Sequence, residues 1–249
     1  MTIIDTAAVL PDVARFRGLV RTGAWAAFAG VALILVQIPI YAAWPPPGTT
    51  QGLFELLADD PVRGLITLDV LYVVSNLLAY LLYLALAVAL WRVSPSAVVV
   101  ALAFGTLGMA AYLASPRAVE MLTLARAYQD AGADERVALL ATGDGMVATW
   151  IGTAFDVYYL FNLVALLVLA VLMYRSAVFG RATAWWGLTA ALLMAVPSSF
   201  GTLGLVFALV SLAPWSVFAV LVGRRMLGLL ATAEGREPGR ARADEAAGR

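Results

Sequence analysis

The chain has 249 residues, of which 63% are apolar and 13% charged, and its formal net charge is zero. Soluble domains are about 45–50% apolar and about 25% charged. The sequence contains no histidine and no cysteine, and all 16 of its basic residues are arginine. These absences exclude zinc held by thiolates, histidine-ligated haem, serine–histidine triads and lysine Schiff bases. We expect no cofactor and no metal site, and the lack of a basic patch argues against nucleic acid as a partner.

The sequence contains six long apolar stretches, and the only charged residues within them are Asp69 and Asp156. Each stretch approaches or exceeds the roughly 20 residues that cross a hydrocarbon core. Backbone polar groups in lipid must be satisfied within their own segment, so these stretches are expected to be helices. The sequence therefore predicts an all-α polytopic membrane bundle with six transmembrane helices, at 24–44, 65–91, 97–114, 146–174, 183–200 and 204–222.

The arginines predict the orientation of these spans. With the N-terminus inside, most arginines fall in cytoplasmic segments, as the positive-inside rule requires. The exceptions lie in the outer loops: Arg63, Arg117, Arg126 and Arg136. Both termini are therefore predicted to be cytoplasmic. We expect a cytoplasmic N-terminal segment at 1–22, the transmembrane domain at 23–228, and a tail at 229–249 that is disordered because its Gly, Ala, Glu and Arg residues have little to bury.

The loop after the first span is expected to have structure of its own. Pro45–Pro47 cannot continue a helix and predicts an extended exit from the span. A short helix is predicted over Leu53–Leu57. Asp60 followed by Pro61 is typical of a helix start, with the aspartate as N-cap and the proline as first helical residue.

The outer loop between the third and fourth spans, 115–143, is expected to be helical as well. It begins with Ser115-Pro116, and the spacing of its apolar residues predicts an amphipathic helix that ends near Gly132. Asp134 is a candidate cap for a second, shorter turn through Leu140. Both elements are predicted to lie on the outer face of the membrane or to cap the bundle.

The two aspartates within the spans are predicted to lie near the outer interface. Residues 61–91, taken as one helix, would be about 46 Å long, so that helix must tilt or protrude. About 20 residues before its inner end is Tyr72, which places Asp69 at or beyond the outer boundary. The same count places Asp156 at the outer boundary of the fourth span. One interpretation is that both carboxylates are solvated or hydrogen-bonded near the head groups, and the other is that they serve a functional site.

Polar side chains accompany both aspartates at helical spacing. Residues three, four or seven positions apart share a helix face, so these side chains form candidate polar faces in the outer half of the bundle. If the faces converge, they form an outward-opening site for a cation, a proton or a small polar ligand; otherwise they are interhelical hydrogen bonds that hold the bundle together. The candidate ligand-binding residues are Asp69, Tyr72, Asn76, Asp156, Tyr159, Asn162, Gln37 and Tyr41.

Two segments carry a family resemblance. One is the Asp-headed span LDVLYVVSNLLAYLLYLALAVALWRVSP, and the other is VLMYRSAVFGRATAWWGLTAALLMAV, which joins the fourth and fifth spans. Both resemble a bacterial six-helix membrane family catalogued as domain of unknown function four-three-eight-six. The resemblance covers most of residues 15–228 and implies the fold and a bacterial inner membrane, but it assigns no activity and no catalytic residue.

The sequence leaves three functional hypotheses. The first is a non-enzymatic protein that binds or moves a small ligand or lipid through the outward polar site. The second is a structural or regulatory membrane subunit that acts through a partner. An intramembrane enzyme using the aspartates comes third, because neither acid stands in a Gly-x-Gly-Asp context. Membrane lipids are the expected partners in all three.

Overall fold

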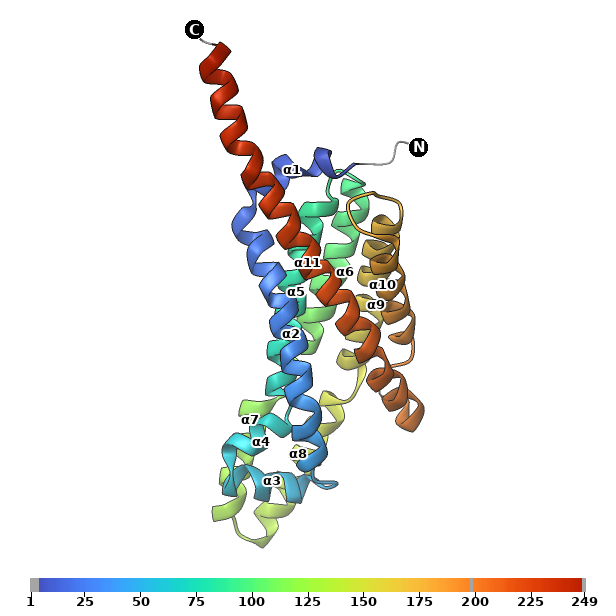
Figure 1. Cartoon of the computed structure of the whole chain (residues 1–249). Coiled ribbons are helices and arrows are strands. Elements are labelled where there is room, and N and C mark those ends of the chain that lie inside the picture. The colour runs from blue at the N-terminus through green and yellow to red at the C-terminus, as the bar shows by residue number, and fades with distance from the viewer. Residues whose placement is uncertain (1–4, 198, 248–249) are drawn as a thin grey trace.

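The computed structural model describes residues 5–197 and 199–247, with side chains described as far as Gly235 (Figure 1). All secondary structure in these ranges is helical, without a strand. The predicted all-α class is therefore confirmed. Five helices are long and apolar enough to cross a membrane, which is compatible with a multi-pass membrane protein.

The long helices form an elongated bundle (Figure 1). Within it, α2 packs against α5 and α11, α6 packs against α5 and α9, and α10 packs against both α9 and α11. The bounds of these six helices are Arg17–Ala43 for α2, Val70–Leu90 for α5, Pro95–Leu113 for α6, Thr153–Tyr174 for α9, Arg181–Leu193 for α10 and Gly201–Ala247 for α11.

The fifth predicted span, 183–200, is shorter in the structure than the sequence predicts. Helix α10 has 13 residues and ends at Leu193, ahead of Pro197. At 1.5 Å per residue it is roughly 20 Å long, less than the hydrocarbon thickness of about 30 Å. Its apolar composition resembles a span, but a proline near the end of the predicted stretch cannot continue the helix.

A short amphipathic helix, α1 (Thr6–Arg15), lies across the end of the bundle that also carries the C-terminal part of α11 (Figure 1). Its buried face consists of Val9, Leu10 and Val13. Helix α11 continues through Ala247 and packs against α1, and Leu229 is fully buried. Residues 229–235 therefore differ from the disordered tail predicted for 229–249, because the sequence alone does not reveal that α1 packs against α11.

The opposite end of the molecule is a helical layer formed by α3 (Thr50–Asp59), α4 (Pro61–Thr67), α7 (Ala118–Asp130) and α8 (Ala133–Trp150) (Figure 1). We call it the outer cap, and the adjoining half of the bundle the outer half, after the side of the membrane on which the sequence predicts them. The cap has a small apolar core of its own, separate from that of the bundle, which includes Phe54, Leu57, Leu68, Met121 and Ala125. An amphipathic helical loop between α6 and α9 is therefore present, as predicted.

The start and end signals of the cap helices are largely as predicted. The Asp60 carboxylate accepts a hydrogen bond from the backbone N–H of Arg63 at 3.0 Å, and Pro61 is the first residue of α4. Helix α7 ends at Asp130, just before Gly132. Gly132, rather than Asp134, is the N-cap of α8, and α8 runs ten residues past the predicted end at Leu140, to Trp150.

Two stretches predicted as continuous spans are broken where the cap meets the bundle. The helix expected over 61–91 breaks at Asp69, whose φ of 62° is in the left-handed region. Leu68, just before it, turns into the core of the cap. The span expected over 146–174 breaks at Gly152, where a Cβ atom would lie 2.6 Å from the carbonyl oxygen of Ala148. Both breaks redirect the chain from cap to bundle, which hydropathy alone does not predict.

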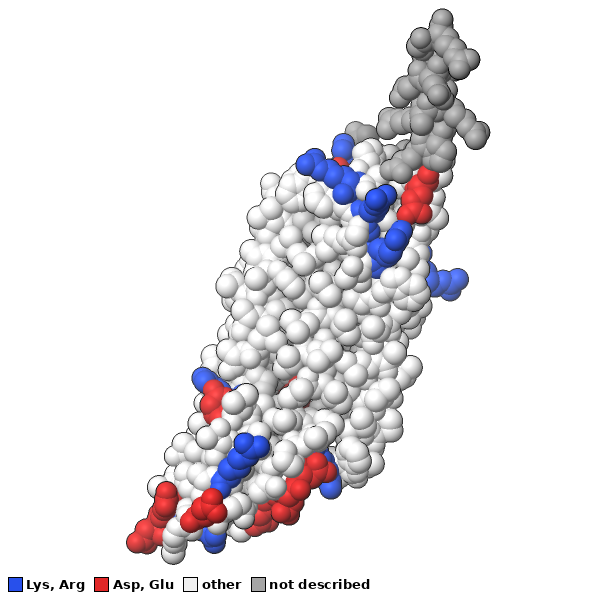
Figure 2. Space-filling view, turned by 90° about the vertical axis from the view of Figure 1, so that its left-hand side faces the viewer, with Lys and Arg blue, Asp and Glu red and all other residues white. Residues whose placement is uncertain are grey.

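Charge separates along the long axis of the molecule. Figure 2 shows acidic side chains gathered at the cap, and arginines as the main charges near the opposite end. The cap segments carry eight acids against four arginines. The acids are Glu55, Asp59, Asp60, Glu120, Asp130, Asp134, Glu135 and Asp144.

Candidate functional site

Asp69 lies at the junction between the cap and the bundle. It immediately precedes α5, and its Oδ2 atom accepts a hydrogen bond of 2.8 Å from the indole Nε1 of Trp150, the last residue of α8. A charged acceptor makes this a stronger bond than one between neutral groups. The contact joins the end of the longest cap helix to the beginning of a bundle helix, so a movement of α8 acts directly on Asp69.

Beneath Asp69, a tyrosine cluster formed by Tyr72, Tyr112, Tyr158 and Asn76 links α5, α6 and α9. The Tyr158 hydroxyl donates to Oδ1 of Asn76 at 2.6 Å and lies 3.2 Å from the Tyr72 hydroxyl. The Asn76 amide nitrogen donates to the Tyr72 carbonyl oxygen at 2.9 Å. The ring of Tyr112 packs edge-on against Tyr72, with centroids 5.1 Å apart. Helix α9 therefore contacts Tyr72 and Asn76 of α5 through Tyr158, which is not among the predicted residues of its polar face.

One buried polar atom beside this cluster has no hydrogen-bond partner within the described residues. It is Oδ1 of Asn162, a residue that is 1% exposed. The amide nitrogen of Asn162 is satisfied, since it donates to the Tyr158 carbonyl oxygen at 2.9 Å. A buried polar group without a partner costs about 1–3 kcal/mol. Oδ1 of Asn162 thus marks a place where a water molecule would be stabilised.

The other predicted site residues make separate contacts. Asp156 accepts a hydrogen bond from the Ser199 hydroxyl, away from the Asp69–Trp150 contact. Gln37 accepts from Ser75 at 3.4 Å, and the Tyr41 hydroxyl donates to the carbonyl oxygen of Ile66 at 3.2 Å. Tyr159 packs against the rings of its neighbours Phe155 and Tyr158. The eight candidates therefore form several hydrogen-bonded groups and not a single pocket.

A cavity of about 540 Å³ lies in the outer cap, between the segment that leads into α3 and the face of α8. Its volume is within the range of about 300–1,000 Å³ that is typical of small-molecule sites. Exposed residues such as Gly48, Gln51 and Asp144 line it, so it opens at the surface of the cap. The lining residues are Pro46, Pro47, Gly48, Thr49, Thr50, Gln51, Leu53, Thr67, Leu140, Asp144, Val147 and Trp150.

Beside the cavity, α3 and α8 approach each other closely. At Gly143 a Cβ atom would lie 2.6 Å from Cγ2 of Thr50 and 2.7 Å from Cζ of Phe54, so a larger residue would have to displace these two side chains. At the same point the Thr50 hydroxyl donates to Oδ1 of Asp144. The preceding prolines keep residues 45–47 out of any helix, which leaves the space open.

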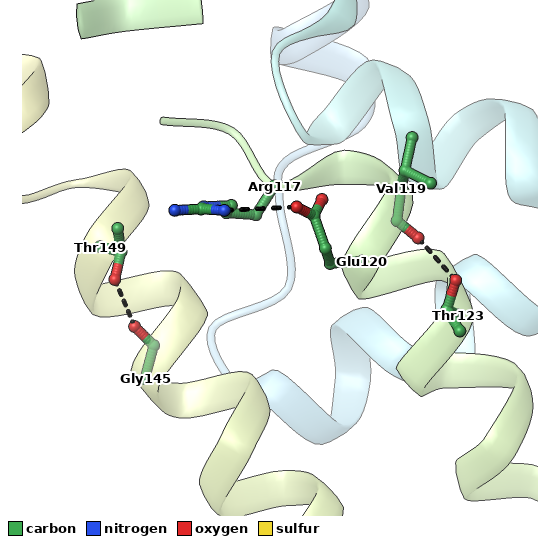
Figure 3. A network of polar contacts seen from close by, with 6 residues as sticks. All are labelled: Arg117, Val119, Glu120, Thr123, Gly145 and Thr149. Atoms are coloured by element: carbon green, nitrogen blue, oxygen red, sulfur yellow. Dashed lines mark hydrogen bonds and ion pairs between the residues drawn. The ribbon is translucent and has the colours of Figure 1, made fainter. Parts of the chain in front are cut away.

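Several polar side chains of the cap make local contacts along their own helix. The Thr123 and Thr149 hydroxyls each donate to a carbonyl oxygen one turn earlier, at Val119 and Gly145, and both distances are 2.9 Å (Figure 3). At the start of α7, Arg117 pairs with Glu120 at 3.3 Å. These contacts stabilise helix ends and turns.

Trp150 connects the two polar regions, because it lines the cap cavity and also holds Asp69. None of the eight residues predicted from sequence lines the cavity. The sequence reasoning missed Trp150, Thr50 and Asp144 as site residues. The signal that could have found them is Gly143, because a glycine inside a helix of the outer loop is costly unless another segment approaches closely.

The inner half of the bundle contrasts with this outer site, because apolar side chains fill it. A cavity of about 20 Å³ between α2, α5 and α11 has room for no more than a single water molecule. The large side chains that are fully buried here include Leu82, Leu86, Leu90, Leu166, Leu169 and Met173. Among the described residues, the side chains buried toward the arginine-rich end are therefore mainly apolar.

Comparisons of the chain with known family models, with curated proteins and with solved structures find no match. The functional argument therefore rests on the geometry of the cap and of its junction with the bundle.

Proposed function

We propose that the chain is a six-span protein of a bacterial inner membrane, with both termini in the cytoplasm. The additional crossing consists of α10 together with the segment that connects Leu193 to α11, because α10 alone is too short. Two observations support this. The N-terminal helix α1 and the C-terminal part of α11 lie at the same end of the bundle, which requires an even number of passes (Figure 1). Arginines are the main charges at that end, as the positive-inside rule expects of a cytoplasmic side (Figure 2).

Single cysteines test this topology, because the chain has no native cysteine. Val119→Cys is placed in the cap at a residue that is 74% exposed, and Arg181→Cys lies at the opposite end, where α10 begins. In intact cells an impermeant thiol reagent should label Val119→Cys and leave Arg181→Cys unlabelled until the cells are opened. The reverse labelling would place the cap in the cytoplasm and overturn the orientation.

For this protein we further propose a binding function: the outer cap receives a small polar ligand in its cavity, outside the membrane. The observation that carries this proposal is the cavity of about 540 Å³ with Trp150 in its wall. Trp150 also donates a hydrogen bond to Asp69, so a ligand that displaces the Trp150 side chain would change a contact of the bundle. Apolar side chains fill the other half of the bundle, so the structure favours binding of a ligand over its transport across the membrane.

A cavity-filling variant tests the binding function. Gly48 lines the cavity, and a Cβ atom there would meet nothing within 4 Å, so Gly48→Trp can place a large ring in the cavity without a backbone clash. Gly132→Trp is the matched control, since Gly132 is equally unobstructed and lies in the same cap but outside the cavity. Both variants and the unaltered chain would be screened in lipid nanodiscs against a library of small polar compounds by thermal shift.

We expect compounds that stabilise the unaltered chain and Gly132→Trp but not Gly48→Trp. Native mass spectrometry of the protein purified from cells should show a retained small molecule with the same dependence on Gly48. Equal retention by Gly48→Trp would move the ligand out of the cavity. If the unaltered chain shows no stabilising compound and no retained molecule, the second hypothesis, a structural or regulatory subunit, replaces the binding function.

A further inference from the structure

The charge of the cavity wall restricts what the cavity can hold. Asp144 is the only ionisable side chain among the lining residues. The four arginines of the cap segments, Arg63, Arg117, Arg126 and Arg136, all lie outside the lining. On this basis we propose that the ligand is a small organic cation, an amine with a hydrocarbon body. This inference rests on the proposed binding function and specifies its ligand class.

Asp144 keeps a free acceptor for such a cation. Its Oδ1 atom accepts from the Thr50 hydroxyl, and no described group donates to Oδ2. The Thr50 contact orients the carboxylate at the point where α8 approaches α3, so the second oxygen is held in place without being satisfied. Hydrogen bonds between a carboxylate and an ammonium group are about twice as strong as neutral ones.

The N-terminus of α3 lies beside Asp144, and its partial positive charge opposes the attraction of Asp144 for cations. A helix N-terminus carries about half a positive charge, which favours anions. Here it meets a full negative charge, so the wall remains negative overall. One of the free N–H groups at this end is already satisfied, because the backbone nitrogen of Gly52 donates to the Thr49 hydroxyl at 3.1 Å. The N-terminus therefore does not convert the cavity into an anion site.

The remaining wall suits the hydrocarbon part of an amine. The indole nitrogen of Trp150 is engaged by Asp69, so what this side chain offers the cavity is aromatic ring surface. Tryptophan is the aromatic residue that attracts cations most strongly. Leu53, Leu140 and Val147 add aliphatic surface. A divalent metal ion is a poorer fit, because Ca²⁺ and Mg²⁺ take six or more oxygen ligands and this wall has one carboxylate.

Three probes that each have four carbon atoms but differ in head group test the ligand class: butylammonium, butanol and butyrate. Their affinities would be measured by calorimetry on the full chain in nanodiscs. The test variant is Asp144→Asn, which preserves an acceptor for Thr50 and removes the charge. The control is Asp134→Asn, another exposed acid of α8 that does not line the cavity.

We expect butylammonium to bind more tightly than the other two probes, and Asp144→Asn to weaken it by about tenfold or more while Asp134→Asn leaves it unchanged. Equal binding of butylammonium and butanol, a preference for butyrate, or unchanged affinity in Asp144→Asn would overturn the inference. Failure of all three probes would also overturn it for simple amines. None of these results decides the binding function itself, which the Gly48→Trp comparison tests independently.

Discussion

The two halves of the molecule are stabilised in different ways. The inner half depends on close contact between helices: at Gly23 of α2, a Cβ atom would lie only 2.3 Å from the Cβ atom of Ala85 on α5. The outer half depends on directed polar contacts, of which the Trp150–Asp69 bond and the tyrosine cluster are the main ones. In lipid, apolar surface gains little by leaving its surroundings, so small residues and interhelical hydrogen bonds must supply the association.

This difference bears on function. Helices that touch through alanine and glycine leave no room for a ligand, whereas the cap, with its own apolar core and its proline-rich entry, leaves a cavity beside α8. The Asp69 backbone, in the left-handed region, lies where these two kinds of packing meet. Such conformations cost of order 1–3 kcal/mol and persist only where the surroundings fix them. A bound ligand is therefore expected to change the conformation most readily at this junction.

The largest effect is expected from disturbing the inner half. Gly23→Ala forces a methyl group into Ala85 and toward the Leu81 carbonyl oxygen, 2.9 Å away, so α2 must move off α5. We expect a loss of about 2 kcal/mol in the free energy of unfolding. Gly18→Ala, in the same helix with nothing within 4 Å, should be neutral or slightly stabilising because alanine favours helix. Denaturation of both variants in mixed micelles measures the difference; equal stabilities would mean that α2 and α5 are not in close contact.

The next effect concerns the junction. Trp150→Phe keeps the ring but removes the donor to Asp69, and we expect a loss of about 1.5 kcal/mol because a hydrogen bond to a charged group is lost. Hydrogen exchange should speed up at the end of α8 and the beginning of α5, while the inner half of α9 stays protected. Asp69→Asn should have a smaller effect, since its amide oxygen can still accept. A uniform increase of exchange throughout the chain would show that Trp150 stabilises the whole fold and not the junction.

A smaller effect is expected in the tyrosine cluster. Asn76→Ala removes the acceptor of the buried Tyr158 hydroxyl, and we expect a loss of about 1 kcal/mol, since polar contacts between membrane helices average about 0.6 kcal/mol. Tyr80→Phe is the control: Tyr80 lies on another part of α5, and the variant removes its hydrogen bond of 2.6 Å to the exposed Thr106 of α6. Chemical denaturation compares the two, and a larger loss in Tyr80→Phe than in Asn76→Ala would contradict a structural role for the cluster.

Much of this fold could be predicted from sequence because its signals are local. Apolar stretches predict the long helices, and Asp60-Pro61 predicts the beginning of α4. The breaks at Asp69 and Gly152 could not be predicted, since each depends on the cap packing against the bundle, which a hydropathy count does not contain. For the same reason the sequence grouped Asp156 with Asp69. Both lie near the outer ends of helices, but only contacts between helices decide which side chains meet, and Asp156 meets Ser199 instead.

The smallest effect is expected at the arginine-rich end, where Arg92 forms a salt bridge with Asp12 of α1. The hydrogen bond and charge of Asp12 raise the pKa of the Arg92 guanidinium, so the arginine is charged at neutral pH. An exposed ion pair contributes little to stability and is screened by salt. Asp12→Asn should therefore leave the unfolding midpoint almost unchanged. It should still raise hydrogen exchange in α1, and high salt should do the same to the unaltered chain but add nothing in the variant. If the variant instead loosened the cap, the two ends of the bundle would be coupled, and the closed inner half would have to move when the outer site fills.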